Sequence, residues 1–100
     1  MPRKPIEKEE DIVIAAASMK AVAHPLRLKI LCVLSGGALN VQDIVDQVGT
    51  TQSNISQHLA ILRDKGILVA HKDANHVYYR IGDLRILKLV GLMREVFCTV

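Results

Sequence analysis

The sequence predicts a mainly α-helical domain that carries a small β-hairpin before its last helix. Three observations predict this class: helical spacing of apolar residues over most of 7–66, two β-prone runs within 67–81, and a return to helical spacing from residue 83. A chain of 100 residues has the size of one small domain. We therefore expect a single domain over residues 1–100, with residues 1–8 flexible.

Composition sets the first limits on function. Half of the residues are apolar, which favours a subunit that buries additional surface against a partner. Three aromatic side chains, Tyr78, Tyr79 and Phe97, are too few for a base-stacking platform. No apolar run reaches the roughly 18 residues that a membrane helix needs, and the charged start "MPRKPIEKEED" does not read as a secretory signal. We expect a cytoplasmic protein with reduced thiols and no membrane partner.

The net charge of +3 is unevenly distributed along the chain. Residues 1–50 hold six basic and six acidic residues, whereas residues 51–100 hold seven basic against four acidic ones. The second half also contains His58, His71 and His76. A modest basic excess of this kind favours a nucleic-acid partner only weakly.

The first two helices are expected at residues 7–22 and 25–34. Apolar residues recur at helical spacing in and just after the first, alanine-rich segment: Ile12, Ala16, Met19 and Ala23. The second segment, "PLRLKILCVL", opens on a proline, which suits the first turn of a helix. The glycine pair at 36–37 ends it.

A helix-turn-helix is expected over residues 41–66. Asn40 is a suitable N-cap for a short helix with one apolar face, formed by Val41, Ile44, Val45 and Val48. Gly49 suits the left-handed conformation of a tight turn, and either Thr50 or Thr51 caps the next helix, which ends at Gly66. Two helices joined by such a turn form a helix-turn-helix.

The second helix of this pair begins with the uncharged segment "TTQSNISQHL". On a helical wheel Ile55, Leu59 and Leu62 form an inner seam, with His58 beside it. The outer arc is small, polar and almost neutral, and contains Gln52, Ser53, Ser56, Gln57, Ala60 and Arg63. Ordinary exposed faces use Lys and Glu, which are better helix formers than Ser, Asn or Thr. This arc therefore favours contact with base edges, which Gln and Ser can bond.

The runs "ILVAHK" and "HVYYRI", separated by "DAN", predict a β-hairpin. A helix-turn-helix followed at once by a hairpin is a winged helix-turn-helix domain, whose hairpin tip would meet phosphates or the minor groove. The residues expected to contact DNA are Gln52, Ser53, Asn54, Ser56, Gln57 and Arg63 in the helix and Lys72, Asn75 and His76 in the hairpin. A hairpin that only caps the core, or a winged helix that binds protein, remains an alternative.

The last helix is expected to run from its cap Asp83 to Phe97 or Cys98. Its main apolar arc contains Ile86, Leu89, Val90, Met93, Val96 and Phe97, with Leu84, Leu87 and Leu92 outside it. So much apolar surface predicts a partner, and the simplest is a second copy bound through the first and last helices. A homodimer would place two recognition helices one DNA turn, or a multiple of it, apart on a pseudo-palindromic double-stranded operator.

The segments "AVAHPLRLKILCVLSGG" and "LNVQDIVDQVGTTQSNISQHLAILRDKGILVAHKDANHVYYRI", with the closing helix, resemble the ArsR (ArsR/SmtB) family of dimeric bacterial repressors. The resemblance covers about residues 19–98, and "SNISQHLAILRDKGIL" is a specific signal. It implies a sequence-specific DNA-binding transcriptional repressor, whose wing is formed by residues 72–76. The base-reading positions in this resemblance are Gln52, Ser53, Ser56 and Gln57. No nucleophile with a neighbouring base and no cofactor loop is evident, so neither an enzyme nor a bound cofactor is expected.

The chain departs from the metal sensors of that family. Asn40, Val41 and Gln42 stand where arsenic and cadmium sensors carry a Cys-x-Cys motif. No histidine follows His76 to serve as a zinc ligand in the last helix, and carboxylates alone are poor ligands for transition metals. The sequence therefore disfavours a metal site.

Cys32 and Cys98 are the two thiols of the chain. On the helical wheels both lie off the main apolar arcs, Cys32 next to Lys29 and Cys98 near Arg94. These two cations either favour the thiolates or are ordinary solvated charges. A free cysteine is otherwise an inert small apolar residue.

The cysteine pair resembles the dithiol, sulfide- and redox-responsive branch of the family that includes BigR, SqrR, HlyU and YgaV. In that branch a cysteine of the second helix and one at the end of the last helix are joined by a disulfide or a longer polysulfide. The resemblance implies that a low-molecular-weight persulfide or oxidant bridges Cys32 and Cys98 and so releases the operator. A repressor that answers a metal, or no signal, with structural cysteines is the alternative.

Overall fold

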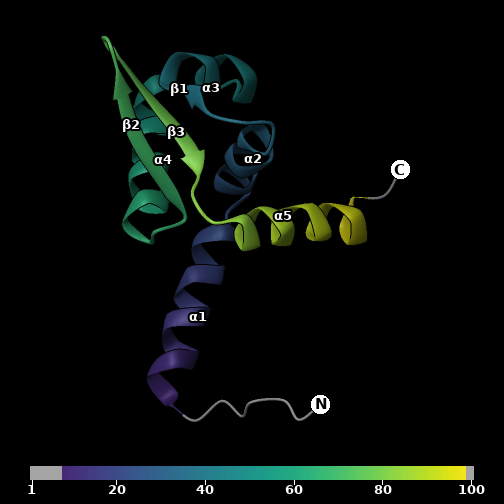
Figure 1. The fold of residues 1–100 in the computed structure, drawn as a ribbon. Helices are drawn as coiled ribbons and strands as arrows, with labels where there is room; N and C mark the ends of the chain where they lie inside the picture. The colour runs from purple at the N-terminus through teal and green to yellow at the C-terminus, as the bar shows by residue number, and fades with distance from the viewer. Residues whose placement is uncertain (1–7, 99–100) are drawn as a thin grey trace.

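The computed structural model describes residues 8–98 of the chain as five helices and three short strands. In chain order they are α1 (Glu9–Val22), α2 (Pro25–Leu34), β1 (Leu39–Asn40), α3 (Val41–Val48), α4 (Gln52–Asp64), β2 (Leu68–Asp73), β3 (His76–Ile81) and α5 (Leu84–Phe97) (Figure 1). This arrangement confirms the mainly helical winged helix-turn-helix predicted from the sequence. Residues 1–7, which include the expected first helical residue Glu7 and most of the segment expected to be flexible, lie outside the described residues.

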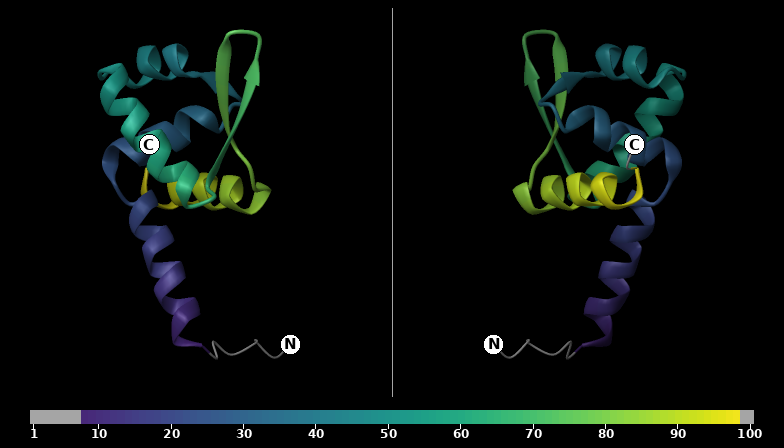
Figure 2. Two further views of the ribbon diagram at one scale, coloured as in Figure 1. Left: turned by 90° about the vertical axis from the view of Figure 1, so that its left-hand side faces the viewer. Right: turned by 90° about the vertical axis from the view of Figure 1, so that its right-hand side faces the viewer.

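The hairpin and α1 extend from opposite ends of the domain. Figures 1 and 2 show the turn between β2 and β3 at one end and the free part of α1 at the other, with α2, α3 and α4 between them. The long helix α5 lies across the base of the hairpin, near the end of α1, and packs on α2 and β3. The wing and the two terminal helices thus occupy different parts of the surface.

The expected hairpin is present, and a third strand joins it. β2 and β3 pair antiparallel from Leu68↔Ile81 to Asp73↔His76, and β1 pairs with the other edge of β3 through Leu39↔Tyr79 and Asn40↔Tyr78. No pattern in the sequence predicted β1, because two residues are too few to show an alternating pattern. Its second residue, Asn40, also accepts a hydrogen bond from the Asp43 backbone N–H at 2.8 Å and so caps α3 as predicted.

One apolar core joins all three central helices to the sheet. Its buried residues are Ala21, Ile30, Leu31, Leu34, Ile44, Val48, Ile55, Leu59, Leu62, Ile67, Leu68 and Val90. Each large aliphatic side chain buried in this way contributes roughly 1.5–3 kcal/mol relative to its exposure to water. Because α2, α3 and α4 share this core, the orientation of α4 is fixed by packing on α2 and α3.

The turn between α3 and α4 depends on a left-handed glycine. Gly49 has φ 86° and ψ 32°, and its N–H donates to the Val45 carbonyl at 2.8 Å. Lys29 of α2 closes the same end of α3, because its Nζ donates to the Val48 carbonyl at 2.9 Å. These contacts set the angle at which α4 leaves the turn.

Replacing Gly49 tests this conformation. We expect Gly49→Ala to lower the free energy of unfolding by about 1–2 kcal/mol, because an L side chain is disfavoured in the left-handed region. Urea unfolding at fixed protein concentration measures the change. Gly36→Ala is the matched control, since Gly36 lacks a positive φ and a Cβ there meets no atom within 4 Å. Equal stability of the two variants would contradict this account of the turn.

Candidate nucleic-acid interface and cysteine pair

One face of α4 is sealed in the core and the other is exposed. Ile55 and Leu62 are fully buried and Leu59 is only 1% exposed, as the predicted inner seam requires. The outer arc is exposed throughout and comprises Gln52, Ser53, Ser56, Gln57, Ala60 and Arg63. The structure therefore groups the predicted base-reading side chains of α4 on one accessible surface.

The beginning of α4 suits an anionic partner. Thr51 is the cap: its Oγ1 accepts a hydrogen bond from the Asn54 backbone N–H at 3.1 Å. The first turn contains no acidic residue, so nothing there offsets the partial positive charge of the helix N-terminus. The remaining backbone N–H groups at such an end are donors of the kind that bind phosphate.

Asn54 has a second role beside its predicted contact with DNA. Its side chain is half-buried, and its Nδ2 donates to Oγ1 of Thr50 at 3.2 Å. This bond ties the first turn of α4 to the preceding loop. A contact between Asn54 and DNA stays a prediction.

The hairpin presents a polar tip. Lys72, Asn75 and His76 are all exposed there, around a turn in which Ala74 has φ 54°. The ring of Tyr78 stacks on His71, with 5.6 Å between centroids, and meets His76 edge-on at 6.3 Å. Because β2 packs against α4, the hairpin that carries the predicted wing residues adjoins the helix that carries the predicted base-reading residues.

Behind the exposed face, a cluster of three side chains joins α4 to α1 and α2. Arg27 donates from Nε to the Ala21 carbonyl at 2.6 Å, and its Nη1 lies 3.1 Å from Nδ1 of His58. The ring of His24 lies 4.6 Å from that of His58, centroid to centroid, and its Nδ1 accepts from the Leu26 N–H at 3.1 Å. His24 thus caps α2 while it contacts α4.

The protonation state of His58 follows from this environment. Burial lowers the pKa of His58 below its ordinary 6.5, and the neighbouring His24 and Arg27 lower this pKa further. The ring is therefore neutral at pH 7. The sequence placed His58 beside the inner seam, but no pattern in it connected residues 24 and 27 with residue 58, because this contact depends on how α2 crosses α4.

The two cysteines differ in their surroundings. Cys98 is exposed directly after α5, whereas Cys32 is half-buried and packs against the core. The prediction that Cys32 lies off the core-facing side of its helix was therefore wrong. A helical wheel assumes one buried side, but α2 contacts α1, α3, α4, α5 and β3, so it is covered over most of its circumference. Both thiols are free in this structure.

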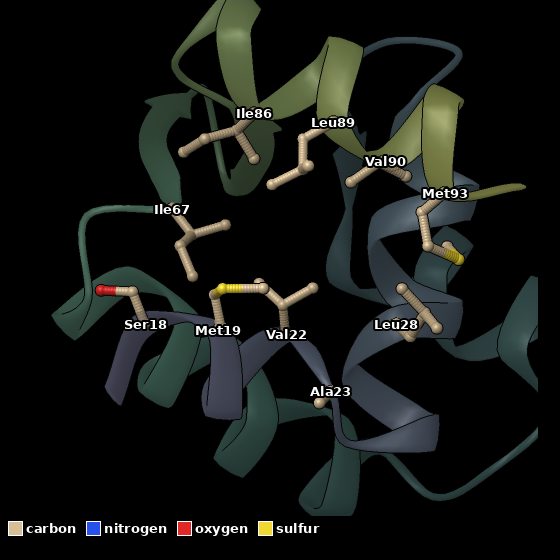
Figure 3. A pocket seen from close by; sticks show the side chains of 10 residues that line it. All are labelled: Ser18, Met19, Val22, Ala23, Leu28, Ile67, Ile86, Leu89, Val90 and Met93. Atoms are coloured by element: carbon tan, nitrogen blue, oxygen red, sulfur yellow. The ribbon is translucent and has the colours of Figure 1, made fainter. Parts of the chain in front are cut away.

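A large apolar surface extends over the two terminal helices. Of the twelve large apolar side chains that are exposed among residues 8–98, nine lie on α1 and α5: Ile12, Val13, Ile14, Met19, Leu84, Leu89, Leu92, Val96 and Phe97. Between the helices lies a pocket of about 420 Å³, whose lining is almost wholly apolar (Figure 3). Met19 and Val22 face it from α1, and Ile86, Leu89 and Met93 from α5.

Two further observations concern the same residues, 8–98. In this part of the chain no helix has the length and apolar character needed to cross a bilayer. Nor does it contain a group of three or more His, Cys, Asp or Glu side chains arranged to hold a metal ion.

Comparison with known proteins identifies the family. Residues 24–69 match the family model described as bacterial regulatory protein, arsR family. The chain is 32% identical over 99 residues to the Biofilm growth-associated repressor of Xylella fastidiosa, a match that covers 99% of this chain and 85% of that protein. The structure of reduced HlyU from Vibrio cholerae has a TM-score of 0.83 and 32% identity, and covers 91% of this chain and 96% of that one.

A further solved structure resembles the whole domain. The homodimeric winged helix-turn-helix DNA-binding domain of Mb0332 from Mycobacterium bovis has a TM-score of 0.83 and 28% identity, and the match covers 96% of this chain and 89% of that one. Fold and site together define a winged helix-turn-helix regulator. The chain belongs to the ArsR family of bacterial transcriptional regulators, as the sequence resemblance indicated. The family consists of regulators, which confirms the expectation that the chain is not an enzyme.

Proposed function

We propose that the protein is a sequence-specific repressor that binds its operator as a homodimer and leaves it when Cys32 and Cys98 are bridged. The observation that carries the DNA-binding part is the exposed outer arc of α4, held in place by the buried seam behind it. Its Gln and Ser side chains offer both donors and acceptors to base edges in the major groove. Arg63 and the wing residues Lys72 and His76 supply contacts to phosphate.

The exposed apolar surface of α1 and α5 supports the homodimer. All of residues 9–16 are exposed although most of them are apolar, and the pocket beside them adds further unfilled apolar surface. Covering such surface is favourable in proportion to its area. The related Mb0332 domain is described as homodimeric. A two-fold dimer presents two copies of α4, and the matching DNA site is a pseudo-palindrome.

In the reaction proposed for release of the operator, a low-molecular-weight persulfide oxidises the two thiols. The thiolate of one cysteine takes the outer sulfur of the persulfide RSSH, which forms a protein persulfide and releases RS⁻. The thiolate of the other cysteine then attacks the inner, protein-bound sulfur and displaces HS⁻. Two thiols become one disulfide, and the persulfide is reduced to a thiol and sulfide. Additional sulfur transfer before closure gives a longer polysulfide bridge.

A bridge would act on DNA binding through α2. This helix carries Cys32 together with Lys29, whose ammonium holds the turn before α4. The other end of the bridge, Cys98, follows α5, which packs on α2 and belongs to the proposed dimer surface. Joining the two thiols would constrain α2 and α5 together and change the spacing of the two copies of α4. A relative of this chain has been solved in a form named reduced HlyU. Such a regulator would act in the cytoplasm, where thiols are normally reduced until an inducer is present.

Selection from random duplex DNA tests the DNA-binding proposal. We expect the reduced protein to enrich one pseudo-palindromic sequence, with an affinity that falls steeply with salt. Gln57→Ala should weaken binding to that sequence about tenfold, the scale of one base-specific contact, and leave binding to unrelated DNA within about twofold. Gln47→Ala replaces an exposed glutamine of α3 outside the arc and should keep the preference. A winged helix that binds protein would enrich no sequence, and this result would overturn the proposal.

The same operator tests the thiol switch. Treatment with a low-molecular-weight persulfide should lower the operator affinity of the parent protein at least about tenfold, a coupling of ordinary size between two sites, and dithiothreitol should restore it. Cys32→Ser and Cys98→Ser should each bind the operator before and after treatment. Mass spectrometry of the intact chain should show loss of two hydrogen atoms, or gain of bridging sulfur, in the parent protein alone. Unchanged binding after treatment would rule out the switch and leave the repressor proposal standing.

A further inference from the structure

Arg27 is placed to connect the dimer-forming part of the chain to the DNA-reading part. Its Nε donates to the Ala21 carbonyl in the last turn of α1, and its Nη1 reaches Nδ1 of His58 in α4. Arg27 is half-buried, so these bonds are shielded in part from water. One guanidinium therefore fixes α4 relative to two other helices at a point on its inner side.

The bond to His58 requires a neutral imidazole. A guanidinium has donors only, so Nδ1 of His58 must accept with its lone pair. A protonated ring carries hydrogen on both nitrogens and a positive charge, so it would lose this bond and repel Arg27. His24 belongs to the same contact. Its ring lies against that of His58, and its own Nδ1 accepts a hydrogen bond from the Leu26 N–H.

The carboxylates among residues 8–98 form no ion pair with His58. The elements that pack against α4 are α1, α2, α3 and β2. Besides His24 and Arg27, their charged or titratable groups are Glu9, Glu10, Asp11, Lys20, Lys29, Cys32, Asp43, Asp46, His71, Lys72 and Asp73. Within residues 8–98 none of these carboxylates forms an ion pair with His58, and Arg27 is its hydrogen-bond partner. The cluster thus consists of one permanent cation and two imidazoles.

We propose that Arg27 is a positioning residue for operator reading: with neutral His58 it fixes α4 against α1 and α2, so that acidification releases α4 and weakens operator binding. The inference rests on the proposed DNA-binding function. Because the pKa of His58 is lowered in the folded protein, the contact is complete above pH 6.5 and is lost as the pH falls from there through the lower, folded value.

The expected sign distinguishes this effect from ordinary electrostatics. Positive charge gained near DNA on acidification would strengthen binding to phosphate. Release of α4 acts in the opposite direction. A fall in operator affinity on acidification therefore cannot come from added charge at the interface.

Operator binding by the reduced, full chain at pH 7.5 and pH 5.5, at constant ionic strength, tests the proposal. The parent protein should lose affinity at the lower pH, by up to about tenfold, the scale of one hydrogen bond to a charged group. His58→Asn places an amide oxygen near the position of Nδ1, where it accepts from Arg27 without titrating. This variant should bind like the parent at pH 7.5 and lose most of the pH dependence, whereas the wing control His71→Asn should keep it.

Variants of Arg27 separate positioning from bulk stability. Arg27→Lys replaces the rigid guanidinium, which places two nitrogens at a fixed separation, by a single nitrogen on a flexible chain. This variant should bind the operator more weakly at pH 7.5 and show a flatter pH profile. Arg27→Met should do the same, and circular dichroism at the assay temperature establishes that it is folded. Equal pH profiles of the parent protein and His58→Asn, or parental affinity in Arg27→Lys, would overturn the proposal.

A measurement without DNA keeps the inference separate from the proposed function. Amide-exchange protection of α4, corrected for the intrinsic effect of pH, should fall at pH 5.5 in the parent protein and persist in His58→Asn. If α4 responds in this way but no DNA sequence is selected at either pH, the DNA-binding proposal fails and the contact stands. If protection of α4 is the same at both pH values, the role assigned to Arg27 and His58 is wrong.

Discussion

The structure depends on the burial of one side of α4. Three aliphatic side chains, Ile55, Leu59 and Leu62, are almost completely removed from water against α2 and α3. This seam permits the rest of α4 to be small and polar, because the helix is held by packing and needs no favourable helix formers on its outer side. A polar arc that would make a poor isolated helix is thereby held as a rigid, accessible surface, of the kind that can contact base edges. The Thr51 cap and the left-handed Gly49 complete the constraint by fixing where α4 begins.

The helix α2 forms side-chain hydrogen bonds with α1, α3 and α4. From one side of α2, Lys29 bonds the end of α3. From another, Arg27 bonds the last turn of α1 and the imidazole of His58. The same helix carries Cys32, half-buried against the core. Two signals of different chemistry, a thiol bridge and a proton on His58, would thus act on DNA binding through one element. This arrangement explains how one winged helix-turn-helix domain could respond to its surroundings.

Much of this fold could be predicted from the sequence because its signals are local. Helical spacing, the caps at Asn40, Thr51 and Asp83, and the alternation in the hairpin each depend on neighbours within a few positions. The outer arc of α4 was predictable for the same reason. The strand β1, the covered position of Cys32 and the Arg27–His58 contact were not, because each depends on how distant segments cross. A helical wheel describes one helix against one partner, and α2 has five.

In the complex that we propose, two copies of the chain present two copies of α4 to one DNA duplex. Hydroxyl-radical footprinting of the selected operator, bound by the reduced full chain, tests this claim most directly. We predict two equivalent protected segments related by two-fold symmetry, with centres about 10 base pairs or a multiple of that apart, the spacing of successive major grooves on one side of the helix. A single protected segment, or uniform protection without symmetry, would contradict the account.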